Sequence, residues 1–123
     1  MMHGSCACGA ITFTTDATPF GMSVCHCQQC RKMSGYCWSS AQVAEADLTI
    51  AGPVTWFQSS QRARRGICPT CGAFLFWQGA GETEISFALG AVDAATGLKL
   101  EKHIFTAEKG DYYAIADGLP QKD

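Results

Sequence analysis

Eight cysteines in 123 residues constrain this chain more than any other feature of its sequence, because seven of them fall into three tight clusters. The clusters read CAC at 6–8, CHCQQC at 25–30 and CPTC at 68–71, and Cys37 stands apart. A disulfide between cysteines two residues apart is strained, whereas several thiolates that converge on one point are what a zinc ion requires. The spacing therefore predicts metal binding rather than disulfide bonds.

The stretch CPTCG at 68–72 has the form of a zinc knuckle, in which two thiolates reach one ion and a glycine takes up the left-handed turn. A knuckle supplies only two ligands. The stretch CACG at 6–9, also closed by a glycine, is the natural source of the other two. We therefore predict a structural zinc site that joins two distant segments, with the ligands Cys6, Cys8, Cys68 and Cys71.

Three cysteines, Cys25, Cys27 and Cys30, remain for a second site. Structural zinc sites are closed by four protein ligands, whereas catalytic sites have three and leave one position for water or substrate. We therefore predict a second zinc site on these three sulfurs, with one position left open for chemistry.

Two alternatives would close that fourth position. Cys37 lies seven residues beyond the last cysteine of the triad and can fold back past Gly35. A histidine is the other candidate. His26 points away from its neighbours if the segment is extended, and His103 is more simply explained as a residue hydrogen-bonded to backbone.

A zinc ion with three thiolates carries a net charge of about −1, so it is a weak Lewis acid for polarising a carbonyl. It is better suited to hold a fourth thiol as a thiolate that attacks an electrophile. Arg31 and Lys32 follow the triad, and we predict that they bind the carboxylates of an anionic thiol; the alternative is a solvated pair of surface cations. The second cation cluster, QRARR at 61–65, is interpreted as a solvated hairpin tip.

Short runs rich in Ile, Val, Thr and aromatic residues recur along the chain, and clusters of Gly, Pro, Asp or Ser separate them. This pattern predicts a mainly β fold of antiparallel sheets in a single domain, residues 1–123. One short helix is expected near 27–34, ended by Gly35. The predicted strands cover 10–15, 36–43, 54–58, 72–77, 84–92 and 102–105.

Composition narrows the class of protein. The apolar fraction of 47% and the charged fraction of 16% are typical of a globular domain. A net charge of −2 gives no reason to expect binding to nucleic acid or to an anionic membrane. No apolar run approaches the length of a membrane span, and the start MMHGSCACGA lacks the pattern of a signal peptide. We therefore expect a soluble cytoplasmic protein.

Six stretches, GSCACGAITF, CHCQQCRKMSG, RGICPTCGAFLFW, ALGAVD, HIF and ADGLP, follow one another in an order that spans nearly the whole chain. With them the sequence resembles the glutathione-dependent formaldehyde-activating enzyme family, which also includes centromere protein V. The resemblance implies a zinc-bound β-tent of antiparallel sheets, with a structural zinc on the two knuckles and a second zinc on Cys25, Cys27 and Cys30. Cys37 departs from the family pattern, in which we expect a small or apolar residue at this position.

The activity implied by the resemblance is of the carbon–sulfur lyase class: formaldehyde and glutathione are joined as S-hydroxymethylglutathione, or the adduct is split. Cys25, Cys27 and Cys30 would then be catalytic through the zinc that they hold, and the partners would be a small glutathione-like thiol and an aldehyde. Two other hypotheses stay open: a zinc-scaffolded binding module without catalysis, and a reversible carrier of glutathione or zinc.

Overall fold

The regular structure of this chain consists of eleven short β-strands, one α-helix and three 3-10 turns, which confirms the mainly β fold expected from its sequence. The computed structural model describes residues 1–123. None of the helices combines the length and the apolar character needed to cross a membrane. The elements are β1 (Met2–Ser5), β2 (Thr12–Thr15), β3 (Phe20–Cys25), α1 (Gln28–Ser34), β4 (Trp38–Ala44), η1 (Glu45–Asp47), β5 (Thr49–Ala51), β6 (Thr55–Gln58), β7 (Ala63–Ile67), β8 (Phe74–Gly79), β9 (Glu84–Ala88), η2 (Leu89–Ala91), β10 (Lys102–Ile104), η3 (Thr106–Glu108) and β11 (Gln121–Lys122), where η marks a single 3-10 turn.

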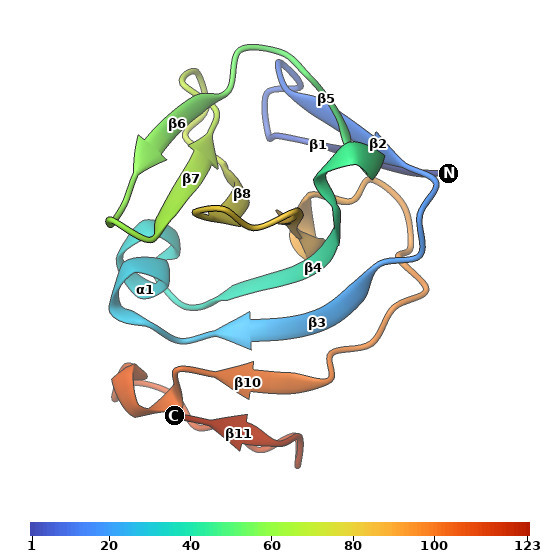
Figure 1. Cartoon of the computed structure of the whole chain (residues 1–123). Helices are drawn as coiled ribbons and strands as arrows, with labels where there is room; N and C mark the ends of the chain where they lie inside the picture. The colour runs from blue at the N-terminus through green and yellow to red at the C-terminus, as the bar shows by residue number, and fades with distance from the viewer.

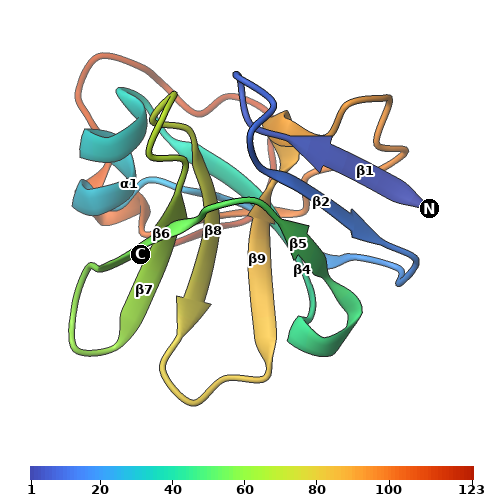
Figure 2. The same ribbon diagram turned by 90° about the horizontal axis from the view of Figure 1, so that it is seen from above.

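Strand pairing divides the chain into a small sheet and a large, strongly curved one (Figure 1). The small sheet has the order β1-β2-β5, and the large sheet has the order β11-β10-β3-β4-β9-β8-β7-β6. Viewed from above, α1 lies on the left of the molecule and the small sheet on the right (Figure 2). Most neighbouring strands are antiparallel, as predicted, but β10 runs parallel to both β3 and β11. The C-terminal segment thus returns to the edge of an early strand.

The main core forms where the small sheet packs on the large one. The rings of Phe76 on β8 and Phe87 on β9 lie 5.4 and 5.3 Å, centroid to centroid, from the ring of Phe13 on β2. All three side chains are at most 1% exposed, as are Ala41 and Val43 on β4. Residues two apart on a strand share a face of the sheet, so the apolar alternation of these strands produces one continuous core face.

The opposite face of the same strands is polar. Ser40 and Gln42 alternate with the core residues of β4, and Ser86 does so on β9, where it pairs in register with Gln42. Ser23 on β3 pairs with Ser40. These four side chains line a cavity rather than the core. The period of two along each strand therefore separates a face that stabilises the fold from a face that is free to bind a ligand.

The interpretation of QRARR as a solvated hairpin tip holds only for Gln61 and Arg62, which are exposed in the turn between β6 and β7, and it is wrong for the rest of the segment. Its residues from Ala63 onward belong to β7, which pairs with β6 on one side and β8 on the other. Arg65 is only 3% exposed. Strands β1, β3, β5, β7 and β11 all lie outside the predicted runs: β5 and β11 have at most three residues, β1 and β7 carry at most one branched or aromatic side chain, and Gly21 interrupts β3. The helix prediction is confirmed: α1 ends at Gly35, which takes a left-handed conformation with φ 82°.

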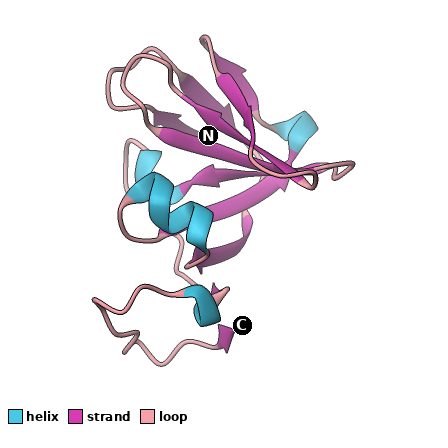
Figure 3. Ribbon diagram, turned by 90° about the vertical axis from the view of Figure 1, so that its left-hand side faces the viewer, coloured by secondary structure: helices cyan, strands magenta, loops and turns pink.

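A chain of side-chain hydrogen bonds holds the C-terminal segment, which lies at one side of the molecule, against the large sheet (Figure 3). Asp117 Oδ2 lies 2.7 Å from Nε2 of His103, and Nδ1 of His103 lies 2.8 Å from Nε2 of His26. The hydroxyl of Tyr113 lies 2.5 Å from Nδ1 of His26. With Tyr113 donating and Asp117 accepting, each ring nitrogen is satisfied while both histidines are neutral. Burial and the neighbouring His103 accordingly lower the pKa of His26.

Replacing Gly4 by alanine should destabilise the core. A Cβ atom at Gly4 would lie 2.0 Å from Cζ of Phe13, which faces it across the β1–β2 pair. Overpacking of this kind costs about 1–3 kcal/mol of unfolding free energy, which urea unfolding followed by tryptophan fluorescence would measure. The control is Gly90→Ala, because an added Cβ there meets nothing within 4 Å and should leave the urea midpoint unchanged. Equal midpoints for the two variants would contradict this account of the core.

Removing the carboxylate of Asp117 should loosen the C-terminal segment. In Asp117→Ala the buried ring of His103 loses the acceptor that orients it, and the amides of β10 and β11 should exchange hydrogen several-fold faster. Asp111→Ala is the matched control, since Asp111 is exposed. Hydrogen exchange read by mass spectrometry over residues 100–123 makes the comparison. Equal exchange in both variants would show that the histidine chain does not hold this segment.

Candidate functional site

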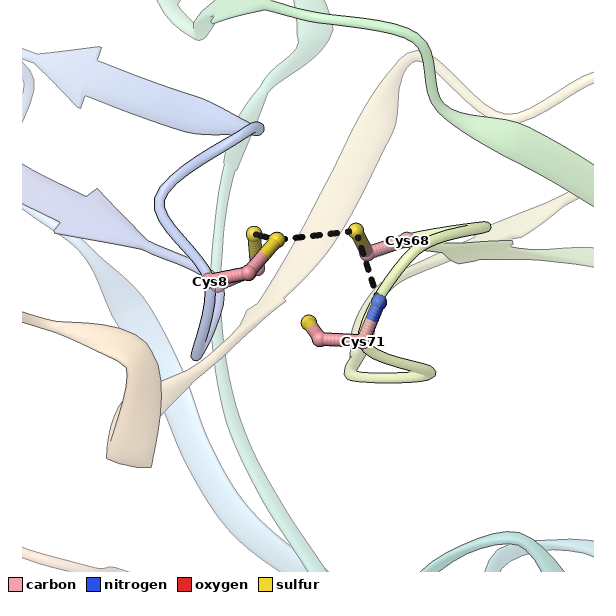
Figure 4. A group of neighbouring side chains, drawn as sticks. Cys8, Cys68 and Cys71 are labelled. Carbon is pink, nitrogen blue, oxygen red and sulfur yellow. Dashed lines mark hydrogen bonds between the residues drawn. The ribbon is translucent and has the colours of Figure 1, made fainter.

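Four cysteine sulfurs from two distant loops meet at one point (Figure 4). Cys6 and Cys8 lie in the loop between β1 and β2, and Cys68 and Cys71 in the loop between β7 and β8. The sulfur of Cys8 lies 3.6 Å from that of Cys6 and 3.7 Å from that of Cys68. A tetrahedral zinc ion with sulfurs at about 2.3 Å holds them about 3.8 Å apart. The cluster therefore has the donor atoms and the spacing that zinc requires.

Matching backbone hydrogen bonds shape the two loops. The amide of Cys6 donates to the carbonyl of Ile11 at 3.0 Å, and the amide of Cys68 donates to that of Ala73 at 3.0 Å. Within the loops, the amide of Ile11 donates to the sulfur of Cys6 at 3.3 Å, and the amide of Cys71 donates to the sulfur of Cys68 at 3.5 Å. Amides that point at sulfur stabilise thiolates, so both loops are built as knuckles.

A glycine closes each knuckle, as the sequence suggests. Gly9 has φ 81° and Gly72 has φ 79°, a left-handed conformation that other residues rarely adopt. The turn at Gly72 brings the amide of Ala73 onto the sulfur of Cys71, and this hydrogen bond lowers the pKa of the Cys71 thiol to about 6. The loop thus favours the thiolate form that binds metal.

The second cluster lies where β3 ends and α1 begins. Cys25 is the last residue of β3, Cys27 is the N-cap of α1, and Cys30 lies in its first turn. The sulfur of Cys27 accepts the amide of Cys30 at 3.3 Å, which is both a helix cap and a hydrogen bond to a prospective ligand. The three sulfurs lie within 4.8 Å of one another. This cluster, which we call the triad, is able to bind zinc with three protein sulfurs.

None of the three alternative ligands joins the triad. Cys37 and both histidines lie outside the group of sulfur atoms that converge there. The ring of His26 points to the other side of the strand end, where His103 and Tyr113 occupy its two nitrogens. The expectation that extended backbone turns His26 away from its neighbours is met by this geometry.

The cation that contacts the triad is Arg65 of β7. Its Nη1 lies 3.3 Å from the sulfur of Cys30, and its Nη2 lies 3.9 Å from the sulfur of Cys27. Nη2 also donates to Oε1 of Gln29 at 3.0 Å, and the guanidinium lies 5.1 Å from the centre of the Phe74 ring. The prediction missed this residue because its strand was not recognised. Alternation within ARRGI, which runs directly into the CPTC knuckle, is the signal that places Arg65 and Ala63 on one face.

Hydrogen bonds among the three triad thiols shift the pKa values of Cys25 and Cys27 in opposite directions. Hydrogen bonds from the thiols of Cys25 and Cys30 hold the pKa of Cys27 well below its ordinary value, and the charge of Arg65 adds to the effect. Hydrogen bonds to Cys27 and Cys30 conversely raise the pKa of Cys25. Three converging sulfurs cannot all ionise beside one arginine, so a divalent cation is what would allow three thiolates here.

A cavity of about 490 Å³ adjoins the triad, inside the curve of the large sheet. Its floor is the polar face of β3, β4 and β9, its walls include two tryptophans, and exposed polar residues form its rim. The lining comprises Ser23, Cys25, Cys27, Gln28, Gln29, Cys30, Trp38, Ser40, Gln42, Ser60, Arg62, Ala63, Arg65, Trp77, Ser86, Ile104, Phe105 and Glu108. A cavity of this size holds a small organic molecule, and all three triad cysteines face it.

Arg31 and Lys32, predicted to bind an anionic thiol, do not line this cavity. Arg31 is half-buried on α1 and Lys32 is exposed. The cations that do line it, Arg62 and Arg65, come from the segment that the sequence suggested was only a solvated turn. Binding of a thiol by Arg31 and Lys32 therefore stays a prediction.

Comparison with solved structures supports the fold. A crystal structure of a Rhodobacter sphaeroides protein is 24% identical in sequence and superposes with a TM-score of 0.59, over 78% of this chain and 92% of that one. A search of curated proteins found no match.

One protein-family profile matches most of the chain. Residues 1–108 match the sequence profile described as glutathione-dependent formaldehyde-activating enzyme. This range includes the four cysteines of the two knuckles, the three cysteines of the triad, and Arg65. The 15 residues beyond it hold Tyr113 and Asp117 of the histidine chain. The motifs, the fold and this match together place the chain in the glutathione-dependent formaldehyde-activating enzyme family.

Proposed function

We propose that this protein is an enzyme that joins a small thiol to an aldehyde, or splits the adduct, with glutathione and formaldehyde as the prototype. The observation that carries the proposal is the placement of the triad: three sulfurs and a buried arginine face a cavity of about 490 Å³. A purely structural cluster would be closed by four protein ligands and has no need of a cavity.

Zinc fits both clusters by the chemistry of their donors. Cys6, Cys8, Cys68 and Cys71 would hold a structural ion, and Cys25, Cys27 and Cys30 would hold a second ion with a position left for substrate. Bound there, zinc would keep an exogenous thiol in its thiolate form at neutral pH. Reduced cysteines as zinc ligands suit a reducing compartment, and we propose the cytoplasm.

The proposed reaction is the addition of a thiol to a carbonyl group. One S–C bond forms between the thiol sulfur and the carbonyl carbon, the C=O π bond opens onto oxygen, and the proton that leaves the thiol ends on the new hydroxyl. The reverse reaction breaks the same S–C bond and returns the proton to sulfur. The protein has no atoms to supply, so its contribution is to bind, orient and ionise the thiol.

Residues of the cavity are suited to bind the body of such a thiol. Ser23, Ser40, Gln42 and Ser86 present hydroxyl and amide groups along the floor, which both donate and accept hydrogen bonds. Arg62 at the rim is exposed and positively charged, which suits a carboxylate. A thiol that carries amide and carboxylate groups, as glutathione does, can use both sets while its sulfur reaches the triad.

The substitution Cys30→Ser should abolish catalysis without unfolding the protein. Zinc-loaded wild-type protein should bind two zinc ions and accelerate exchange between free and thiol-bound formaldehyde, measured by NMR exchange spectroscopy. Cys30→Ser should bind one zinc ion and return the exchange to its uncatalysed rate, because the triad loses a ligand.

The matched control is Cys37→Ser, the same substitution at a cysteine outside both clusters, which should retain two zinc ions and full activity. Wild-type protein with two zinc ions but no rate above the uncatalysed one, over several thiols, would exclude the enzyme. A thiol that nevertheless binds would then indicate a carrier, and a triad that binds none would indicate a scaffold.

A further inference from the structure

Arg65 carries a buried positive charge that no carboxylate neutralises. Its side chain is 3% exposed, and neither of the two ion pairs in the chain includes it. Its Nε has no hydrogen-bond partner at all. Burying an unpaired guanidinium is strongly unfavourable. An anion that pairs with the guanidinium in the functional state would offset this cost.

Among the groups of this chain that contact Arg65, only the triad can supply that anion. Gln29, which accepts from Nη2 at 3.0 Å, is neutral, and the ring of Phe74 offers only the weak attraction of its π face. The remaining contacts are the sulfurs of Cys30 and Cys27. Arg65 is therefore directed at the atoms that would hold the second zinc ion.

The charges explain what such a contact achieves. Three thiolates and a divalent cation sum to about −1, so a fourth thiolate would bring the centre to about −2 inside a partly desolvated cavity. With the guanidinium included, the centre is neutral before the fourth thiolate binds and about −1 after it. A neutral ligand, in contrast, leaves the net charge of the centre unchanged.

We propose that Arg65 is a positioning residue that offsets the charge of the triad and thereby lets it accept an anionic thiolate as fourth ligand. This inference rests on the proposed function, since it concerns the same centre. It adds a selectivity: Arg65 favours thiolates over neutral ligands of the same metal site. It also assigns to β7, rather than to the cations that follow the triad, the charge that makes thiol binding favourable.

Cobalt(II) substituted for zinc gives a readout that does not depend on activity, because its absorption bands report the ligands around the ion. Glutathione and imidazole are each titrated into cobalt-loaded protein, one as an anionic and the other as a neutral ligand. Arg65→Met should weaken glutathione binding at least tenfold and leave imidazole binding unchanged. Arg65→Lys, which retains the charge, should restore most of the glutathione affinity.

The matched control is Arg64→Met, the same change of charge one residue away on the other face of β7. Arg64 lies over the ring of Trp56 and donates to Gln78, and it does not line the cavity. Both ligands should bind this variant as they bind the wild type. Equal glutathione affinity in Arg64→Met and Arg65→Met would overturn the inference.

A second variant covers the case in which Arg65→Met does not fold. Gln29→Glu leaves Arg65 in place but puts a carboxylate beside its Nη2, at an exposed position. Glutathione binding should weaken and imidazole binding should not, and the effect should exceed that of Gln28→Glu, which adds the same charge next to it. Equal effects of the two glutamates would overturn the inference.

The same titrations separate the inference from the proposed function. If glutathione perturbs the cobalt bands of the wild type and of Arg65→Met with the same affinity, the thiol site stands and the role of Arg65 falls. If glutathione leaves the bands of the wild type unchanged at every concentration, no thiol binds the triad, and both fall together.

Discussion

The convergence of four sulfurs from the two knuckles is the constraint on which the rest of this structure depends. It joins the loop after β1 to the loop after β7, which are about 60 residues apart in the sequence. A metal ion that closes so long a loop removes much conformational entropy from the unfolded chain. The same junction sets Phe13 of the small sheet against Phe76 and Phe87, so the cysteine cluster and the aromatic core favour one arrangement of the two sheets.

That arrangement gives the large sheet two different faces. Its apolar face is covered by the small sheet, and its polar face curves around a cavity that ends at the triad. A rigid sheet floor would suit the proposed reaction, in which the protein would contribute no atoms and would only have to orient two reactants. The histidine chain behind the triad adds a second support, because His26 lies between two of the triad cysteines and is bonded to the C-terminal segment.

Residues that lie close together in the sequence predicted much of this structure. Cysteine spacing indicated both clusters, since C-x-C and C-x-x-C bring sulfurs together with no long-range information. Gly9, Gly72 and Gly35 marked turns that need a left-handed residue. Runs rich in aromatic and branched residues predicted β2, β4, β6, β8, β9 and β10. The missed strands β3 and β7 have weak patterns because each contains a glycine and carries few branched or aromatic side chains.

By itself, then, the sequence determined which cysteines cluster, the strand-rich class and the family, since each depends on residues close together in the chain or on ordered motifs. Only the tertiary structure decided which cation contacts the sulfurs of the triad. Arg31 and Lys32 are its neighbours in sequence, yet the contact comes from Arg65, which is brought in by the pairing of β7 with β6 and β8. Burial and charge pairing depend on which strands lie side by side, and strand pairing is a long-range property that no short window of sequence contains.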